Sequence, residues 1–206
     1  GKTPLSFKGR CLELTSREVC KPCNEGWMST LENRAKDPLV QMIEGRSVVL
    51  DVELQAVVAA WAVKTSMVFE HTLGASPPGI YWSAQERMAF RVPPHVPPGE
   101  TTVTIAAYSG IRYAYFSGGA HDVRLISNTG PVVPGTTATL MVGKLVLQVR
   151  SNRWKAVTGN EFLLWPTAGS DRAEWIWPRQ HPQVAWPPAA PLDDSILEVF
   201  AGHRPD

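Results

Sequence analysis

The chain has 206 residues, 44% of them hydrophobic and eight of them Trp, enough to bury a core in one domain or in two small ones. Its 20 basic and 19 acidic side chains give a formal net charge of +1, which excludes a bulk attraction to nucleic acid or to an anionic membrane. The longest apolar run, around 54–63, is too short to span a bilayer, and residues 1–16 lack the layout of a signal peptide. We therefore expect a cytoplasmic protein with no membrane partner.

The first third of the chain is helical in pattern after a short alternating segment. Residues 6–19 alternate loosely around a polar turn, which predicts a hairpin. A helix then begins at Cys23 and ends before Pro38, because the residue preceding a proline avoids the helical region. A further helical turn, 39–44, stops at Gly45. The apolar positions of the first helix have helical spacing: Trp27, Leu31 and Ala35.

The clearest helix spans 51–70. Asp51 is a good N-cap, because its carboxylate can accept a hydrogen bond from a free N–H group of the first turn. We expect one face of this helix, together with Trp27 and Leu31, to form core; that face holds Leu54, Val57, Val58, Trp61, Thr65, Val68 and Phe69.

After His71 the pattern changes to proline-rich loops and strands. The capping box Ser83-x-x-Glu86 predicts a brief helix. Alternating segments bounded by Gly predict antiparallel strands within 101–110, 112–127 and 138–151, with shorter candidates at 161–166 and 173–178. A terminal helix is expected to be capped by Asp194 or Ser195 and to stop at Gly202.

These elements predict an α+β protein. An N-terminal part, 1–70, holds the hairpin and the helices, and a second part, 71–206, holds a mainly antiparallel sheet with Trp-Pro loops and the terminal helix. The two parts form either separate units or one compact domain.

The chain has three Cys, too few for a disulfide framework, and two of them form a Cys-x-x-Cys pair at a helix start. A hairpin followed by such a pair is the second half of a treble-clef zinc site, where the helix N-terminus stabilises the thiolates. Cys20 and Cys23 would supply two ligands and Cys11 a third, so zinc is possible only if a fourth ligand exists. The alternatives are two reduced thiols without metal, or a redox pair. The redox interpretation is disfavoured because this region lacks the βαβ unit of thioredoxin-type proteins.

Residues 19–39, VCKPCNEGWMSTLENRAKDPL, resemble the HNH endonuclease-like hypothetical proteins of actinobacteria and their phages. The similarity continues through 59–70 and, more faintly, 176–200. In that family an upstream Cys-x-x-Cys knuckle completes the zinc site, and a His-bearing strand precedes the motif. Residues 1–10 hold neither Cys nor His. The resemblance therefore implies a chain that begins after the knuckle or has lost it.

The resemblance also bears on catalysis, because HNH-type hydrolysis needs a His base and a divalent metal. No His precedes His71, and the helix 51–70 would extend about 30 Å at 1.5 Å per residue, so we expect His71 to lie far from the thiols. The Asn24 side chain suits two roles equally well, that of a helix N-cap and that of a metal ligand. We assign no catalytic residue and predict no cleavage by this chain alone. If the chain is an enzyme, it is a metal-dependent nuclease of the HNH type.

A basic segment, 123–160, contains no Asp or Glu. Cations and an aromatic on a sheet edge can hold a phosphate backbone and stack a base, so we predict nucleic-acid contacts from Lys144, Arg150, Arg153, Trp154 and Lys155. The alternative is an edge strand protected from aggregation by its cations.

Three Trp-Pro pairs begin at Trp165, Trp177 and Trp186. Proline fixes extended backbone and Trp offers a large apolar face, so these pairs either cover the sheet as core or form a groove for a protein partner.

Two functional hypotheses follow. The first is a degenerate or truncated HNH-nuclease-like protein, non-catalytic alone and directed at nucleic acid. The second is a protein-interaction module that binds its partner through the Trp-Pro region, with a phage genome as one candidate source.

Overall fold

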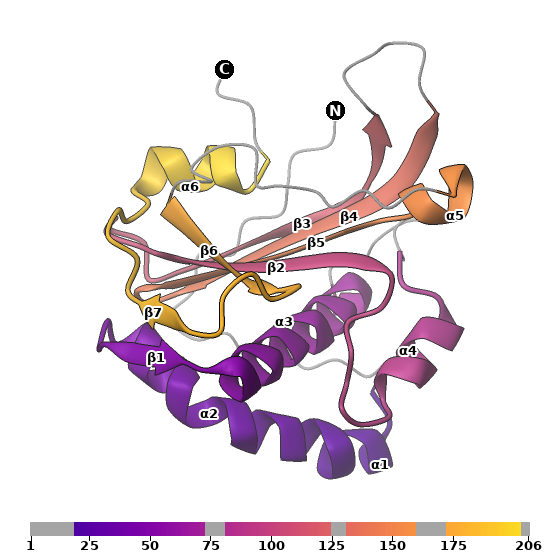
Figure 1. Ribbon diagram of the computed structural model, residues 1–206, viewed down its shortest axis with the longest axis horizontal. Coiled ribbons are helices and arrows are strands. Elements are labelled where there is room, and N and C mark those ends of the chain that lie inside the picture. Colours follow the sequence, from indigo (N-terminus) through magenta and orange to yellow (C-terminus); the bar gives the residue numbers. More distant parts are fainter. Residues whose placement is uncertain (1–18, 73–80, 125–130, 160–171, 203–206) are drawn as a thin grey trace.

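The computed structural model describes residues 19–72, 81–124, 131–159 and 172–202 (Figure 1). Helices come first in these residues, an antiparallel sheet follows, and a short helix ends the described chain. The predicted α+β class is therefore confirmed. The hairpin predicted for 6–19 and the strand predicted for 161–166 lie outside the described residues, apart from the end of the former at Val19.

The first helical segment is continuous: α1 (Lys21–Cys23), a π-helical turn η1 (Asn24–Met28) and α2 (Ser29–Ile43) follow without a break. The prediction that the helix ends before Pro38 is wrong, because Pro38 lies inside α2. An internal proline removes one hydrogen bond and costs about 3 kcal/mol. Here Pro38 is itself buried with its neighbours, so packing of this face offsets that cost. The helix ends just before Gly45, as predicted, where φ is +75°.

The central helix, α3 (Val52–Thr72), is capped by Asp51, whose Oδ1 accepts the Leu54 N–H at 2.8 Å. It is buried nearly all round rather than on one face, because it lies between α2 and the large sheet (Figure 1). By length and composition its 52–71 stretch could cross a membrane, but 56% of this apolar stretch is buried inside the protein, as in a core helix. The predicted core positions divide into fully buried Val57 and Val58 and partly buried Leu54, Trp61, Val68 and Phe69.

The large sheet has five antiparallel strands in the order β3-β4-β5-β2-β6. Each strand predicted within the described residues is present, and the 138–151 segment contains a complete hairpin turn. The bounds are β2 Glu100–Ala107, β3 Ala114–Arg124, β4 Val132–Val142, β5 Leu145–Asn152 and β6 Ala173–Trp177.

Both faces of this sheet are covered, which explains why its central strands are almost wholly buried. In β5, Leu147 and Val149 belong to the core shared with α3, whereas Val146 belongs to a second core under α6 (Asp194–Phe200) (Figure 1). The predicted cap of α6 is wrong: Asp193 caps it by accepting the Ile196 N–H at 2.9 Å.

A second, two-stranded sheet pairs a strand from the first quarter of the chain with a strand from the last quarter. β1 (Val48–Leu50) pairs antiparallel with β7 (Val184–Trp186), and the sequence patterns predicted neither strand. The first core cluster likewise combines side chains from before and after residue 70. Two short helices complete the described fold, namely α4 (Ala84–Phe90), with the predicted capping box, and α5 (Trp154–Thr158).

The β4–β5 turn packs on the end of α2. Gly143 has φ +55°, and the neighbouring Lys144 N–H donates to the Ile43 carbonyl at 2.9 Å. A Cβ at position 143 would overlap that same carbonyl oxygen. Only glycine satisfies both the backbone conformation and this approach.

We expect Gly143→Ala to lower the free energy of unfolding by at least about 2 kcal/mol more than Gly159→Ala. Gly159 also has a positive φ, +77°, but no atom of the described residues lies within 4 Å of its Cβ position, so this variant reports backbone strain alone. Urea denaturation of both variants measures the difference. Equal losses would show that the approach to α2 contributes nothing.

Candidate functional site

The two predicted thiols meet at the start of the first helix. Cys20 is its N-cap residue, with extended backbone, and the Cys20 carbonyl accepts the N–H groups of Cys23 and Asn24, each at 3.0 Å. The Cys23 thiol is hydrogen-bonded to the Cys20 sulfur. Cys20 is exposed and Cys23 is half-buried, so the pair lies at the surface.

The two thiols differ in acidity. The pKa of Cys20 is lowered, chiefly by hydrogen bonds from the Cys23 side chain and backbone, with a smaller contribution from the nearby Arg91 guanidinium. The pKa of Cys23 is raised, chiefly by its hydrogen bond to Cys20. The first thiolate therefore forms at Cys20.

A hollow of about 240 Å³ opens beside the thiols, between the start of the first helix, the end of α3, and α4. Its apolar wall includes Trp27 and Phe90, whose rings meet edge to face with centroids 6.0 Å apart. Buried Met28 and Met67 complete that wall. We call this hollow the thiol pocket.

His71 lies on the lining of the thiol pocket, together with Cys20 and Cys23. The expectation that it lies far from the thiols is therefore wrong. The first helix and α3 are of similar length and pack against each other in opposite directions, so the C-terminal end of α3 returns to the N-terminal end of α1 (Figure 1).

Cations line the pocket, and none of its described lining residues is Asp or Glu. Lys64 pairs with Glu32 at 2.5 Å, and Arg87 pairs with Glu70 at 2.7 Å. Arg91 makes no ion pair with the described residues. The pocket therefore has one cation whose charge no described carboxylate neutralises.

The described residues supply only part of a metal site. In 19–72, 81–124, 131–159 and 172–202, no group of three or more His, Cys, Asp or Glu could share an ion. Cys20 and Cys23 have the sulfur donors and the spacing for half of a tetrahedral zinc site, and Cys11 lies outside the described residues. A complete site would need ligands beyond those described.

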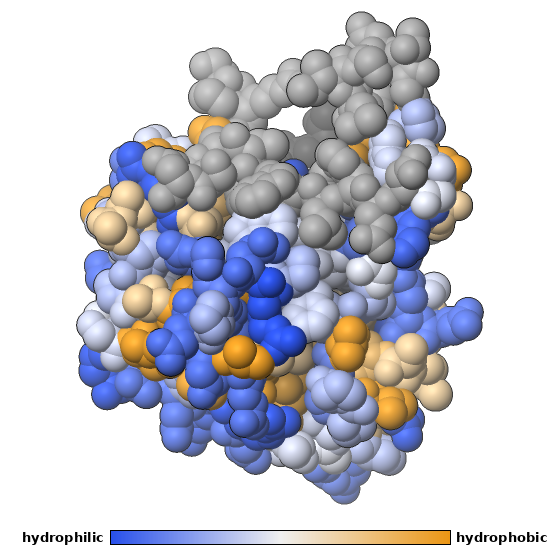
Figure 2. Space-filling view, viewed as in Figure 1, coloured by the Kyte–Doolittle hydropathy of each residue, from blue (hydrophilic) through white to orange (hydrophobic). Residues whose placement is uncertain are grey.

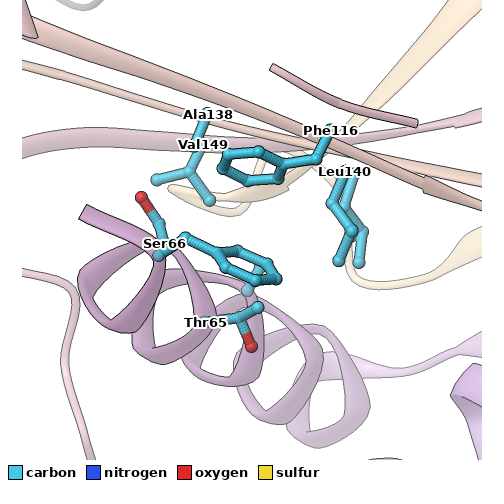
Figure 3. A pocket seen from close by; sticks show the side chains of 9 residues that line it. Thr65, Ser66, Phe116, Ala138, Leu140 and Val149 are labelled. Carbon is cyan, nitrogen blue, oxygen red and sulfur yellow. The ribbon is translucent and has the colours of Figure 1, made fainter. Parts of the chain in front are cut away.

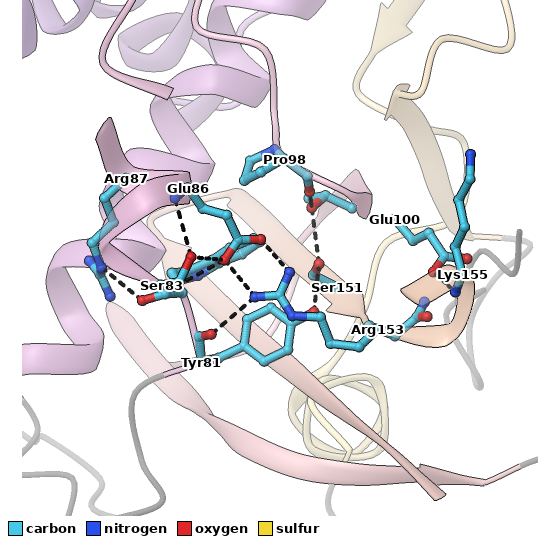
Figure 4. A network of polar contacts seen from close by, with 12 residues as sticks. Tyr81, Ser83, Glu86, Arg87, Pro98, Glu100, Ser151, Arg153 and Lys155 are labelled. Atoms are coloured by element: carbon cyan, nitrogen blue, oxygen red, sulfur yellow. Dashed lines mark hydrogen bonds and ion pairs between the residues drawn. The ribbon is translucent and has the colours of Figure 1, made fainter. Parts of the chain in front are cut away.

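Two of the five predicted nucleic-acid residues, Arg153 and Trp154, are occupied by internal contacts at one end of β5. Arg153 forms an ion pair with Glu86, with Nη2 2.6 Å from Oε2, and its guanidinium stacks on the Tyr81 ring at 4.4 Å (Figure 4). Trp154 is only 6% exposed, so its ring cannot stack a base without rearrangement.

The other predicted basic residues lie apart from one another. Lys144 is exposed at the β4–β5 turn, and Lys155 is exposed in α5, at the opposite end of β5. Arg150 is mostly buried, and burial lowers its pKa. The five residues thus do not form one basic face.

The Trp-Pro residues also serve the fold. Trp186 is 2% exposed and belongs to the first core, and Trp177 is half-buried against it. Trp165 lies outside the described residues. The Trp-Pro pairs were predicted either to pack over the sheet or to form a groove for a protein partner. Trp186 and Trp177 pack against the core.

A second hollow, between α3 and the sheet, is only a packing gap (Figure 3). Its volume is about 10 Å³, at the lower limit for one water molecule. Phe69 and Phe116 close it with ring centroids 4.3 Å apart, and the buried Ser66 hydroxyl finds no hydrogen-bond partner among the described residues.

No known family model, curated protein or solved structure matches this chain. Its function is therefore inferred from its own residues and geometry.

Glu70, the partner of Arg87, has a raised pKa of about 7, because burial disfavours its charged form more than Arg87 favours it. The folded protein then holds a proton that the unfolded chain releases near 4.5. Stability should fall as pH rises through this window, by about 2 to 3 kcal/mol, and should be level above it. Glu70→Gln should abolish this component in denaturation from about pH 5 to pH 8. Glu53→Gln, at an exposed ion pair, is the control, and parallel profiles for wild type and Glu70→Gln would refute the assignment.

Proposed function

We propose that this chain is a nucleic-acid-directed protein of the HNH-like kind that does not cleave its target alone. One observation carries the proposal: the paired thiols at the helix start share a pocket with His71 and with Arg91. Arg91 forms no ion pair with any described carboxylate. A thiol pair at a helix N-terminus, followed by the 19–39 motif, is what the resemblance to that family leads one to expect. The thiols would hold part of a structural zinc site that ligands outside the described residues complete.

The proposal assigns the nucleic-acid contact to the thiol end of the molecule rather than to 123–160. Within the described chain Arg91 makes no ion pair, and Lys21 pairs only with Glu25, at 3.7 Å on the exposed surface. An exposed pair of this kind contributes little stability, so both cations are available to phosphates. Arg153, by contrast, would have to leave Glu86.

The absence of cleavage is also part of the proposal. Hydrolysis needs a base and a metal that holds the scissile phosphate. His71 is the one described His on the pocket lining and so the natural candidate base. The described residues around it do not form a group of three metal ligands.

Binding is tested by fluorescence anisotropy of labelled duplex and single-stranded DNA at several salt concentrations. Arg91→Gln combined with Lys21→Gln should weaken binding and lower the log–log salt slope by about 1 for each phosphate that the protein no longer neutralises. Arg179→Gln, an exposed cation between β6 and β7, should change neither. If Lys144→Gln with Lys155→Gln weakens binding while the first pair has no effect, the phosphate-binding surface belongs to 123–160.

We expect the purified chain not to cleave DNA when magnesium, manganese, nickel or zinc is supplied. Incubation of supercoiled plasmid and of single-stranded DNA, followed by electrophoresis, measures this. Cleavage that disappears in His71→Ala but survives His181→Ala, outside the thiol pocket, would show that the pocket is an active site.

A second candidate, a protein-interaction module, is favoured by exposed apolar side chains around α4 (Figure 2). Met88, Val92 and Val96 are 60%, 63% and 51% exposed. Several large exposed apolar side chains within one short segment, 88–96, are typical of interaction surfaces. This surface replaces the Trp-Pro region as the place where a protein partner would bind, and DNA binding that is absent at low salt would favour it.

A further inference from the structure

The thiol pocket has the dimensions and walls of a small-molecule site. Trp27 is partly buried, and Met28, Met67 and Phe90 are each at most 6% exposed. These side chains come from three helical segments that are held by the core, so the hollow is preformed. Preformed concave sites with apolar walls and a few polar groups are where proteins bind small ligands.

The walls suit a flat, apolar body. Trp27 and Phe90 provide aromatic surface, and Met28, Met67 and Met88 provide unbranched side chains that adapt to the shape of a ligand. The Trp27 indole N–H makes no hydrogen bond of good geometry within the described chain, although it lies near enough to Cys23 to favour its thiolate.

The charges of the pocket select an anion. Lys64 is paired with Glu32, and Arg87 is paired with Glu70, which is charged above its pKa of about 7, whereas Arg91 is not paired by any described carboxylate at any pH. No Asp or Glu is among the described lining residues to repel a negative group. One surplus cation beside an apolar hollow is complementary to one carboxylate on an apolar body.

The volume limits the size of that body. A dry cavity of about 150 Å³ accepts benzene. The thiol pocket, at about 240 Å³, therefore has room for a ring with a short side chain, roughly ten to twelve non-hydrogen atoms.

We infer that the thiol pocket binds a small aromatic carboxylate, with its ring against Trp27 and the methionines and its carboxylate at Arg91. This site shares Arg91 with the proposed nucleic-acid contact but does not rest on that contact, because the ligand also needs the hollow, whereas DNA needs only the surface cations.

The test is calorimetric titration with 3-phenylpropanoate, a probe of this size, and with its neutral amide, 3-phenylpropanamide, in the absence of DNA. We expect the acid to bind with a dissociation constant of about 1 mM or tighter and the amide to bind at least about fivefold more weakly. Arg91→Gln should remove this preference, and Arg179→Gln should leave it unchanged. Equal binding of acid and amide to wild type, or no binding of the acid, would overturn the inference.

A second measurement locates the ligand. Val68→Phe fills the hollow from α3 and should weaken acid and amide alike, with a circular-dichroism melt to verify the fold. Cys20 lines the same hollow, so 3-phenylpropanoate should slow the alkylation of Cys20 by neutral iodoacetamide. Peptide mapping measures the extent of alkylation at Cys20. Binding that is unaffected by Val68→Phe and leaves Cys20 alkylation unchanged would place the ligand elsewhere and refute the site. DNA binding that persists after such a result would leave the proposed function intact.

Discussion

The burial of α3 between α2 and the five-stranded sheet is the interaction on which the rest of the structure depends. Ala59, Ala60 and Ala62 let the neighbouring elements approach closely, and Val58 and Val63 are completely buried in the same core. Removal of this apolar surface from water is the main stabilising term for the described fold. It also fixes the direction of α3, which runs back along α2.

That direction creates the candidate site. The last turns of α3 come back to the first turn of the first described helix, so His71 and the Cys20–Cys23 pair line one hollow. α4 closes the hollow because Arg87 reaches Glu70 on α3 and also donates to the Met67 carbonyl at 2.7 Å. Three separate helical segments thus meet through the packing of α3 on α2 and through the ion pair between Arg87 and Glu70.

The same tertiary contacts remove residues that the sequence made attractive as binding groups. Arg153 lies in a segment without Asp or Glu, yet Glu86 comes from α4 to pair with it (Figure 4). Trp186 belongs to a Trp-Pro pair whose sequence is compatible with a groove, yet β7 pairs with β1 and turns it into the core. The charge of a sequence segment does not include the carboxylates that folding brings to it from other segments. The sequence also does not show whether an aromatic side chain will face the core or the solvent.

Local signals were sufficient where the physics is local. The caps at Asp51 and at Ser83 with Glu86, the strand alternation of β2 to β6, and the thiol pair at a helix start all follow from hydrogen bonds or side-chain periods within a few residues, and the structure has them. The helix through Pro38, the β1–β7 pairing and the proximity of His71 to the thiols could not be predicted in this way. Each depends on the free energy of packing between segments that are distant in the sequence, and this free energy outweighs the local conformational preference. Local sequence patterns do not show which distant segments will pack together, so only the tertiary structure decides these features.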